Sequence, residues 1–206
     1  LLAIDRAGIV GADGETHQGI YDISFLRILP NIVLMTPSNE QEMWKMLNTG
    51  LNFKGIGAVR YPRGFTEGLD LDLSDEELEI GKSKTITKGE KIAYLVFGTL
   101  LNTVLKLAKK NGASVIDMRF VKPIDEKMII SVCQTHEYIF TVEDNVILGG
   151  AGSAVNEVVH KNNIRANIIN LGVPDNIVSH GSQDEIFAEL SLDVYGLENQ
   201  TNDHIK

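Results

Sequence analysis

The sequence is organised around Asp5-Arg6-Ala7-Gly8-Ile9-Val10-Gly11-Ala12-Asp13-Gly14-Glu15-Thr16-His17-Gln18-Gly19, here called the opening loop. It follows an apolar run at residues 1–4, which reads as the end of a buried strand. Glycine is used where the backbone takes positive φ or passes close to a ligand. Polar, glycine-rich loops at the carboxyl end of a strand are where open α/β sheets usually bind ligands. An ordinary surface loop is the alternative, but the charged residues favour an anion site.

Composition places the chain among ordinary globular proteins. The 206 residues are 43% apolar and 23% charged, enough for one large domain or two small ones. The net charge of −9 arises mainly from residues 65–81, which hold seven acids and no base. The sequence therefore argues against nucleic acid as a partner, because it has no basic stripe to neutralise phosphates. No apolar run of about 18 residues predicts a membrane span.

The first 64 residues carry the alternating pattern of an α/β domain. Residues 22–29 have helical spacing, and the wholly apolar run at residues 32–35 is typical of a parallel strand covered on both faces. Ser38 with Gln41 predicts a capping box for a helix that ends near Gly50, and residues 56–61 read as the next strand. This pattern predicts a parallel sheet, followed by an acidic linker at residues 65–81 that crosses the surface.

A second α/β pattern extends from residue 82 to residue 206. Strands are expected at residues 92–97, 114–118, 138–142 and 168–171, and helices at residues 100–110, 125–132, 152–160 and 182–190. Asp125 is placed to cap one helix, and Ser182 with Glu185 forms a capping box for another. A final polar helix is expected from about residue 192. The chain is therefore predicted to contain two α/β units.

Arg6 and Arg63 both follow a predicted parallel strand and should project at the carboxyl edge of one sheet. Guanidinium groups bind phosphate bidentately and stay charged, which suits a phosphorylated ligand. The alternative is a structural salt bridge, for instance from Arg6 to Asp5 or Asp13. Arg60 alternates along its strand and is interpreted as structural.

His17 is the only histidine among the first 64 residues, and an imidazole can transfer protons near neutral pH. Asp13 could orient the loop or bind substrate hydroxyls, although an aspartate before Gly14 is also an ordinary turn residue. No pair of His, Cys or carboxylate residues has convincing metal-ligand spacing. The single cysteine, Cys133, lies in an apolar stretch and is expected to be buried and inert, in a reducing compartment.

The run Gly149-Gly150-Ala151-Gly152-Ser153 sits between a predicted strand and a predicted helix. Its spacing is not that of a dinucleotide-binding loop, and its acidic neighbour Glu143 precedes it instead of following by about 20 residues. Close helix packing, with a subunit interface as one possibility, is the better interpretation.

Together these motifs resemble the 1-deoxy-D-xylulose-5-phosphate synthase family of transketolase-like, thiamine-diphosphate-dependent enzymes. The resemblance rests on the opening loop, on Arg60-Tyr61-Pro62-Arg63-Gly64, on Asp117-Met118-Arg119-Phe120-Val121-Lys122-Pro123 and on the glycine run above. It covers nearly the whole chain but only the last third of such an enzyme. The chain then corresponds to the end of the pyrimidine-binding domain (residues 1–64), the linker (65–81) and the transketolase C-terminal domain (82–206).

The resemblance implies a transferase that condenses pyruvate with D-glyceraldehyde 3-phosphate, with loss of carbon dioxide, on the route to isoprenoids, thiamine and pyridoxal phosphate. Arg6 and Arg63 would hold the phosphate, Asp13 would bind substrate hydroxyls and His17 would handle protons. Thiamine diphosphate and Mg²⁺ are the implied cofactors, yet no residue of this chain is confidently assigned to either. The implied enzyme is a cytoplasmic homodimer, bacterial in preference to plastid.

Two other interpretations remain at this point. One is another thiamine-diphosphate enzyme, such as a pyruvate dehydrogenase β subunit or a transketolase. The other is a non-catalytic assembly module that uses the α/β fold for subunit contacts. Because the region preceding this part of the synthase would carry most of the cofactor site, the isolated chain is predicted to be inactive without that N-terminal region as a partner.

Overall fold

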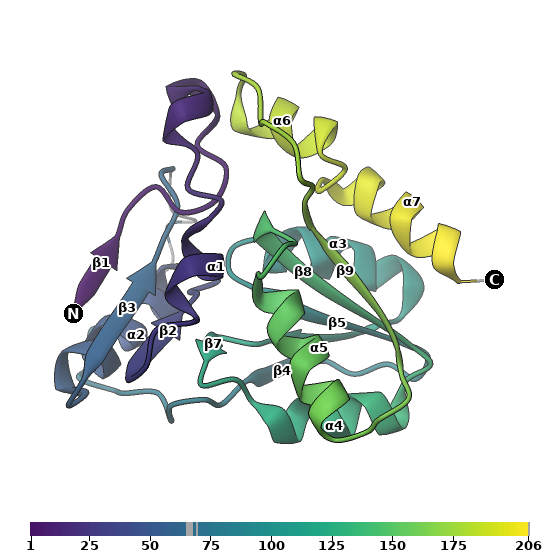
Figure 1. Cartoon of the computed structure of the whole chain (residues 1–206), viewed down its shortest axis with the longest axis horizontal. Coiled ribbons are helices and arrows are strands. Elements are labelled where there is room, and N and C mark those ends of the chain that lie inside the picture. The colour runs from purple at the N-terminus through teal and green to yellow at the C-terminus, as the bar shows by residue number, and fades with distance from the viewer. Residues whose placement is uncertain (65–67, 69, 206) are drawn as a thin grey trace.

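The computed structural model describes residues 1–64, 68 and 70–205, and it contains two α/β units with separate sheets (Figure 1). We call residues 1–64 the first unit and residues 82–205 the second unit. Part of the predicted acidic linker, residues 65–67 and 69, lies outside the described residues. The exact domain boundaries therefore stay a prediction.

The first sheet has the strand order β1-β3-β2-β7. Strands β1 (Leu2–Ile4), β2 (Ile32–Met35) and β3 (Ile56–Arg60) are parallel, as the sequence predicted. Strand β7 (Phe120–Lys122) pairs antiparallel with β2, although it belongs to the second half of the chain. The sequence analysis did not predict this strand. The second unit therefore contributes one strand to the sheet of the first.

Two helices accompany the first sheet: α1 (Asp22–Leu26) and α2 (Glu40–Asn52). The first is shorter than the helix predicted at residues 22–29. The predicted cap of the second was wrong: Asn39, not Ser38, accepts the capping hydrogen bond, from the Glu42 N–H at 2.9 Å. Ser38 instead donates its hydroxyl to the Asp117 carboxylate at 2.6 Å. A tertiary partner has thus displaced the local cap.

The second sheet has the order β4-β6-β5-β8-β9. Its parallel strands are β5 (Ile92–Phe97), β6 (Ser114–Asp117), β8 (Tyr138–Val146) and β9 (Asn167–Val173), and the unpredicted edge strand β4 (Lys84–Thr87) is antiparallel. Helices cover both faces: α3 (Leu101–Asn111) and α7 (Val194–His204) pack on one core, α4 (Glu126–Thr135) and α5 (Ala151–Lys161) on the other. The cap at Asp125 and the capping box of α6 (Gln183–Glu189) are confirmed.

The opening loop contains two short 3₁₀ turns, η1 (Gly11–Asp13) and η2 (Glu15–His17). Figure 1 shows the loop and α6 at the same end of the molecule. Gln183, the first residue of α6, donates its side-chain amide to the Ile9 carbonyl at 2.9 Å. The second unit therefore supports the loop that the sequence analysis singled out.

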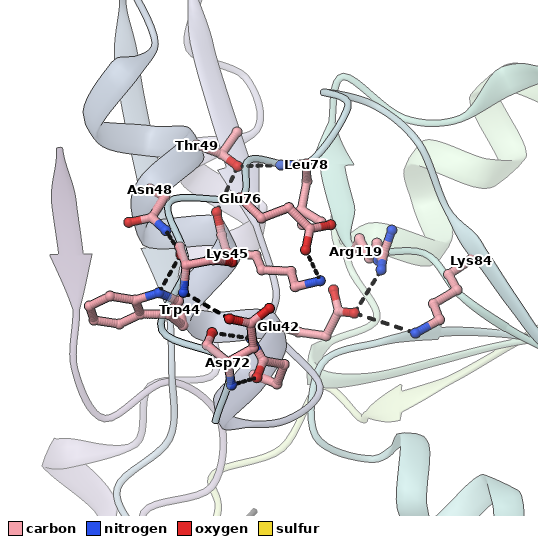
Figure 2. Close-up of polar contacts among 12 residues, drawn as sticks. Glu42, Trp44, Lys45, Asn48, Thr49, Asp72, Glu76, Leu78, Lys84 and Arg119 are labelled. Atoms are coloured by element: carbon pink, nitrogen blue, oxygen red, sulfur yellow. Dashed lines mark hydrogen bonds and ion pairs between the residues drawn. The ribbon is translucent and has the colours of Figure 1, made fainter. Parts of the chain in front are cut away.

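Residues 72–78, here called the strap, run along one face of α2 (Figure 2). Their acidic side chains are exposed, as composition suggests, but their backbone is fastened to side chains of the helix. The bonds are Gln41 with Asp72, Trp44 and Asn48 with the Ser74 carbonyl, and Thr49 with the Leu78 N–H, beside the ion pair of Lys45 with Glu76. The strap is thus bound along its length to the helix it crosses.

Candidate functional site

The opening loop is closed at its base by a two-residue bridge. The Gly8 N–H donates to the Gly19 carbonyl at 2.7 Å, and the Gly19 N–H donates back to Gly8 at 2.9 Å. A side chain at residue 19 would collide with the Arg6 carbonyl, so the close approach of the two arms requires glycine there. Higher in the loop, the Val10 N–H donates to the Gln18 side chain at 2.8 Å. The loop is therefore a closed structure with a defined base.

Above this base, Arg6, Asp13 and Arg63 form an ionic cluster. The Arg6 Nε atom lies 3.2 Å from Asp13 Oδ2, and a guanidinium nitrogen of Arg63 bonds the other oxygen of the same carboxylate. Arg6 also pairs with Asp5 at 2.7 Å. Hydrogen bonds from Arg63 and then from Arg6 hold the pKa of Asp13 below its usual value. Two half-exposed guanidinium groups thus share one carboxylate.

This geometry bears on both interpretations of the arginines. The salt bridge from Arg6 to Asp5 and Asp13, the structural alternative, is present. Arg6 and Arg63 nevertheless converge from the ends of two neighbouring parallel strands, β1 and β3, and keep about half of their side-chain surface exposed, at 46% and 53%. A cluster with that exposure can exchange its internal carboxylate for an external anion.

His17 lies apart from this cluster in its polar contacts. It is exposed at the end of η2, its Nδ1 atom lies 3.0 Å from the Thr16 hydroxyl, and its backbone N–H donates to the Gly14 carbonyl at 3.1 Å. The structure therefore places His17 in the same loop as Asp13 but does not bring it into the ionic cluster.

A cleft of about 590 Å³ lies beside Arg63, between the two units. It opens at the carboxyl ends of β1, β3 and β5, the edge at which open α/β sheets hold ligands. Its polar lining from the first unit includes Asp5, Ser38 and Asn39, and from the second unit Thr99, Thr103 and Gln183. Arg63 thus belongs both to the ionic cluster and to the lining of a cleft that the two units share.

Beneath the loop, Arg60 is almost fully buried among carboxylates. It donates to Asp22 at 2.7 Å, to Asp144 of the second unit at 2.6 Å and to the Gly19 carbonyl at 3.3 Å. Burial alone would lower the pKa of Arg60, but Asp144 and Asp22 outweigh it and raise the pKa above its ordinary value. The interpretation of Arg60 as a structural residue agrees with this burial, but the sequence analysis did not identify its partner Asp144.

Glu143 explains the glycine run at residues 149–153. Its carboxylate accepts the backbone N–H groups of Ala151 and Gly152 at 2.7 and 2.8 Å, at the start of α5. A side chain at Gly150 would collide with this carboxylate. Burial raises the pKa of Glu143 to about 8. The helix N-terminus that a dinucleotide phosphate would need is therefore already occupied by a side chain of the chain itself.

Three further expectations concern metal ligands, the cysteine and membrane spans. Among residues 1–64, 68 and 70–205, no group of three or more His, Cys, Asp or Glu side chains is arranged to hold a metal ion. Cys133 is half-buried, not fully buried as predicted, and burial raises the pKa of its thiol. No helix within the described ranges is long and apolar enough to cross a membrane.

Comparisons with known proteins identify both units. Residues 1–67 match the family described as transketolase, pyrimidine binding domain, and residues 81–197 match transketolase, C-terminal domain. A 1-deoxy-D-xylulose-5-phosphate synthase of Idiomarina loihiensis is 53% identical over 206 residues, all of this chain and 33% of that protein. The synthase of Pasteurella multocida is 55% identical over 200 residues, 97% of this chain and 32% of that protein.

Two solved structures share the fold. A split gene transketolase, described as an inactive β4 tetramer, superimposes with a TM-score of 0.85 at 22% identity, over 98% of this chain and 65% of that chain. A transketolase of Campylobacter jejuni gives 0.71 at 19% identity, over 98% of this chain and 31% of that chain. The chain spans about a third of the length of the curated relatives it matches.

Proposed function

The chain belongs to the transketolase family, and from that premise we propose that it forms the acceptor-binding part of a 1-deoxy-D-xylulose-5-phosphate synthase. Such an enzyme condenses pyruvate with D-glyceraldehyde 3-phosphate and releases carbon dioxide. Two such synthases that match this chain at 53% and 55% of the aligned positions support this choice of enzyme. The observation that carries it is the convergence of Arg6 and Arg63 on Asp13.

In this proposal the phosphate of the acceptor takes the place of the Asp13 carboxylate between the two guanidinium groups. A phosphate monoester offers more acceptor oxygens and more charge than a carboxylate, and arginine binds it bidentately. Asp13, once displaced, accepts hydrogen bonds from the hydroxyl groups of the acceptor. His17 is exposed on the same loop and moves a proton to or from an oxygen of the reacting substrate.

The implied cofactors are thiamine diphosphate and Mg²⁺. Among the described residues, no group of three or more His, Cys, Asp or Glu side chains is arranged to hold a metal ion. We propose that the N-terminal region present in the longer relatives supplies that part of the site. Self-association, as in a homodimer, and a cytoplasmic location belong to the same proposal.

The test is a chimera in which this chain replaces the matching third of the Idiomarina loihiensis synthase. We expect it to form product from pyruvate and glyceraldehyde 3-phosphate. Arg63→Gln should raise KM for glyceraldehyde 3-phosphate about tenfold to a hundredfold, because a charge-assisted phosphate contact is lost. It should change KM for unphosphorylated glyceraldehyde far less.

Arg165→Gln is the matched control, because Arg165 is exposed and lies outside the loop and the cleft. The proposal fails if the chimera folds but is inactive with this substrate pair, or if Arg63→Gln changes KM for the two aldehydes equally. The isolated chain is expected to show no turnover, and turnover by it would contradict the proposed division of the site.

A further inference from the structure

We propose that Arg60 and Asp144 are positioning residues that hold the base of the opening loop, and so set the place of Asp13 and His17 in the active site. The inference rests on the proposed function for its catalytic consequence, but its structural part concerns this chain alone. Neither residue touches the ionic cluster directly. Their effect passes through the backbone of Gly8 and Gly19.

The first step is the contact of Arg60 with the loop. Arg60 lies on β3 with only 3% of its surface exposed, and it donates to the Gly19 carbonyl at 3.3 Å. That same carbonyl accepts the Gly8 N–H in the bridge at the base of the loop. Arg60 therefore binds the loop at the atom on which its closure depends.

The second step is the contact of Asp144 with the other arm. Its carboxylate packs against Gly8 so closely that a Cβ atom at residue 8 would collide with it. One oxygen of this carboxylate accepts a hydrogen bond from Arg60 Nη1 at 2.6 Å. Arg60 of the first unit therefore contacts the bridge at Gly19, and Asp144 of the second unit packs against it at Gly8.

Two neighbouring hydrogen bonds also join this region to the second unit. The Val146 N–H donates to the Ile20 carbonyl at 2.8 Å, and the Ile23 N–H donates to Asn145 at 3.2 Å. Ile9 in the loop and Ile20 directly after it are both buried in the core of the second unit. The base of the loop therefore packs against β8, while residues 15–17 of the loop are exposed.

The arrangement of its three partners favours an arginine at residue 60. Its guanidinium group donates hydrogen bonds to Asp22 of α1, to Asp144 of β8 and to the backbone carbonyl of Gly19. A lysine would keep the charge but offers one compact ammonium group instead of a planar fork. In Arg60→Lys the ammonium group can still neutralise the two carboxylates, but it cannot also bind the Gly19 carbonyl. The variant therefore tests the contact with the loop while the positive charge is kept.

Hydrogen exchange on the 206-residue chain tests the structural part. Arg60→Lys should raise the exchange rates of the amides in residues 9–18 about tenfold or more, because the base of the loop opens locally. Exchange in β5 should change less. Arg27→Lys is the matched control, since Arg27 also joins the units, through Glu157 and the Gly149 carbonyl, without touching the loop.

The inference would be overturned if Arg60→Lys raised the amide exchange rates of the loop and of β5 equally. It would also be overturned if the loop amides exchanged at the same rates in Arg60→Lys and Arg27→Lys. If Arg60→Lys does not fold, Asp144→Asn carries the same test with the same expected result. In the chimeric synthase, Arg60→Lys should lower kcat with glyceraldehyde 3-phosphate about tenfold to a hundredfold, because catalytic groups are misplaced.

Arg27→Lys should leave that kcat within about twofold, since it alters only the contact between units. If Arg60→Lys raised the exchange rates of the loop amides but left kcat unchanged, the proposed effect on catalysis would be wrong. An inactive chimera with the natural sequence would instead count against the proposed function, while the exchange result for the loop would still stand.

Discussion

Asp144 of the second unit lies against the backbone of Gly8 in the first, leaving no room for a side chain at residue 8. Gly8→Ala should therefore suffer both a collision and the strain of a positive φ of 74°. Gly112 is the matched control, because it has a similar φ of 67° and no atom within 4 Å of an added Cβ. Gly112→Ala should cost about 1–2 kcal/mol from backbone strain alone.

Gly8→Ala should lower the free energy of unfolding by about 1–3 kcal/mol more than Gly112→Ala, the usual cost of overpacking. Urea denaturation of both variants measures the difference. Equal losses of stability would mean that the Asp144 side chain moves away from an added Cβ without lowering the free energy of unfolding. The base of the loop would then not be tightly packed.

A second prediction concerns the carboxylate that the two arginines share. Asp13→Asn removes the internal counter-ion of Arg6 and Arg63, so the chain should bind inorganic phosphate roughly threefold to tenfold more tightly. Arg63→Gln should weaken the same binding. Titration followed by NMR or calorimetry measures both, with Asp175→Asn, an exposed acid elsewhere, as control. Weaker phosphate binding by Asp13→Asn would show that Asp13 supports the site instead of competing for it.

A third prediction is a pH dependence that originates at Glu143. Burial raises its pKa to about 8, so between its ordinary pKa of 4.5 and about 8 the folded chain holds a proton that the unfolded chain has released. The free energy of unfolding should therefore fall as pH rises through this range, by at most about 1.4 kcal/mol per pH unit from this group.

Asp117 acts in the same direction, but only up to its own raised pKa of about 6. The informative window is thus pH 6.5 to 8. Glu143→Gln should flatten the dependence there, while Glu126→Gln, which removes an acid paired with Lys161 near the surface, should not. Denaturation at several pH values in both variants decides it, and a slope that persists in Glu143→Gln would assign the effect to another group.

A fourth prediction tests whether the strap is fastened to α2. The Thr49 hydroxyl accepts the N–H of the buried Leu78 at 2.8 Å. Thr49→Val leaves that N–H without a partner, which should cost about 1–3 kcal/mol and expose the strap to proteolysis. Thr49→Ser keeps the acceptor and is the control. If both variants resist protease as the natural chain does, the strap is held by its other contacts.

Local sequence signals predicted most of the elements. The apolar run at residues 32–35 and the cap at Asp125 depend on neighbouring residues only, and both are confirmed. The signal at Ser38 failed because Asp117, 79 positions away, provides a better partner for its hydroxyl than the helix does. Strand β7 was missed for the same reason: three residues have no periodicity of their own and become a strand by pairing with β2.

In the candidate site, too, features that depend on local sequence were predicted and those that depend on distant residues were not. Arg6 and Arg63 follow parallel strands, so the sequence predicted their convergence, and the resemblance supplied their proposed ligand. The role of Asp144 could not be predicted, because its bond to Arg60 joins residues 84 positions apart in different units. The placement of His17 outside the ionic cluster also escaped prediction, since spacing within a loop does not determine where each side chain points.

The pairing of β7 with β2 also bears on how the chain folds. The sheet of the first unit cannot be completed until residues 120–122 have arrived, long after residues 32–35 in chain order. Closing so long a segment is entropically costly and tends to come late in folding. The two units are thus expected to gain their final stability in one cooperative step. Cutting the chain between them would leave the earlier sheet with an unpaired edge along β2, the kind of edge at which β-proteins associate with one another.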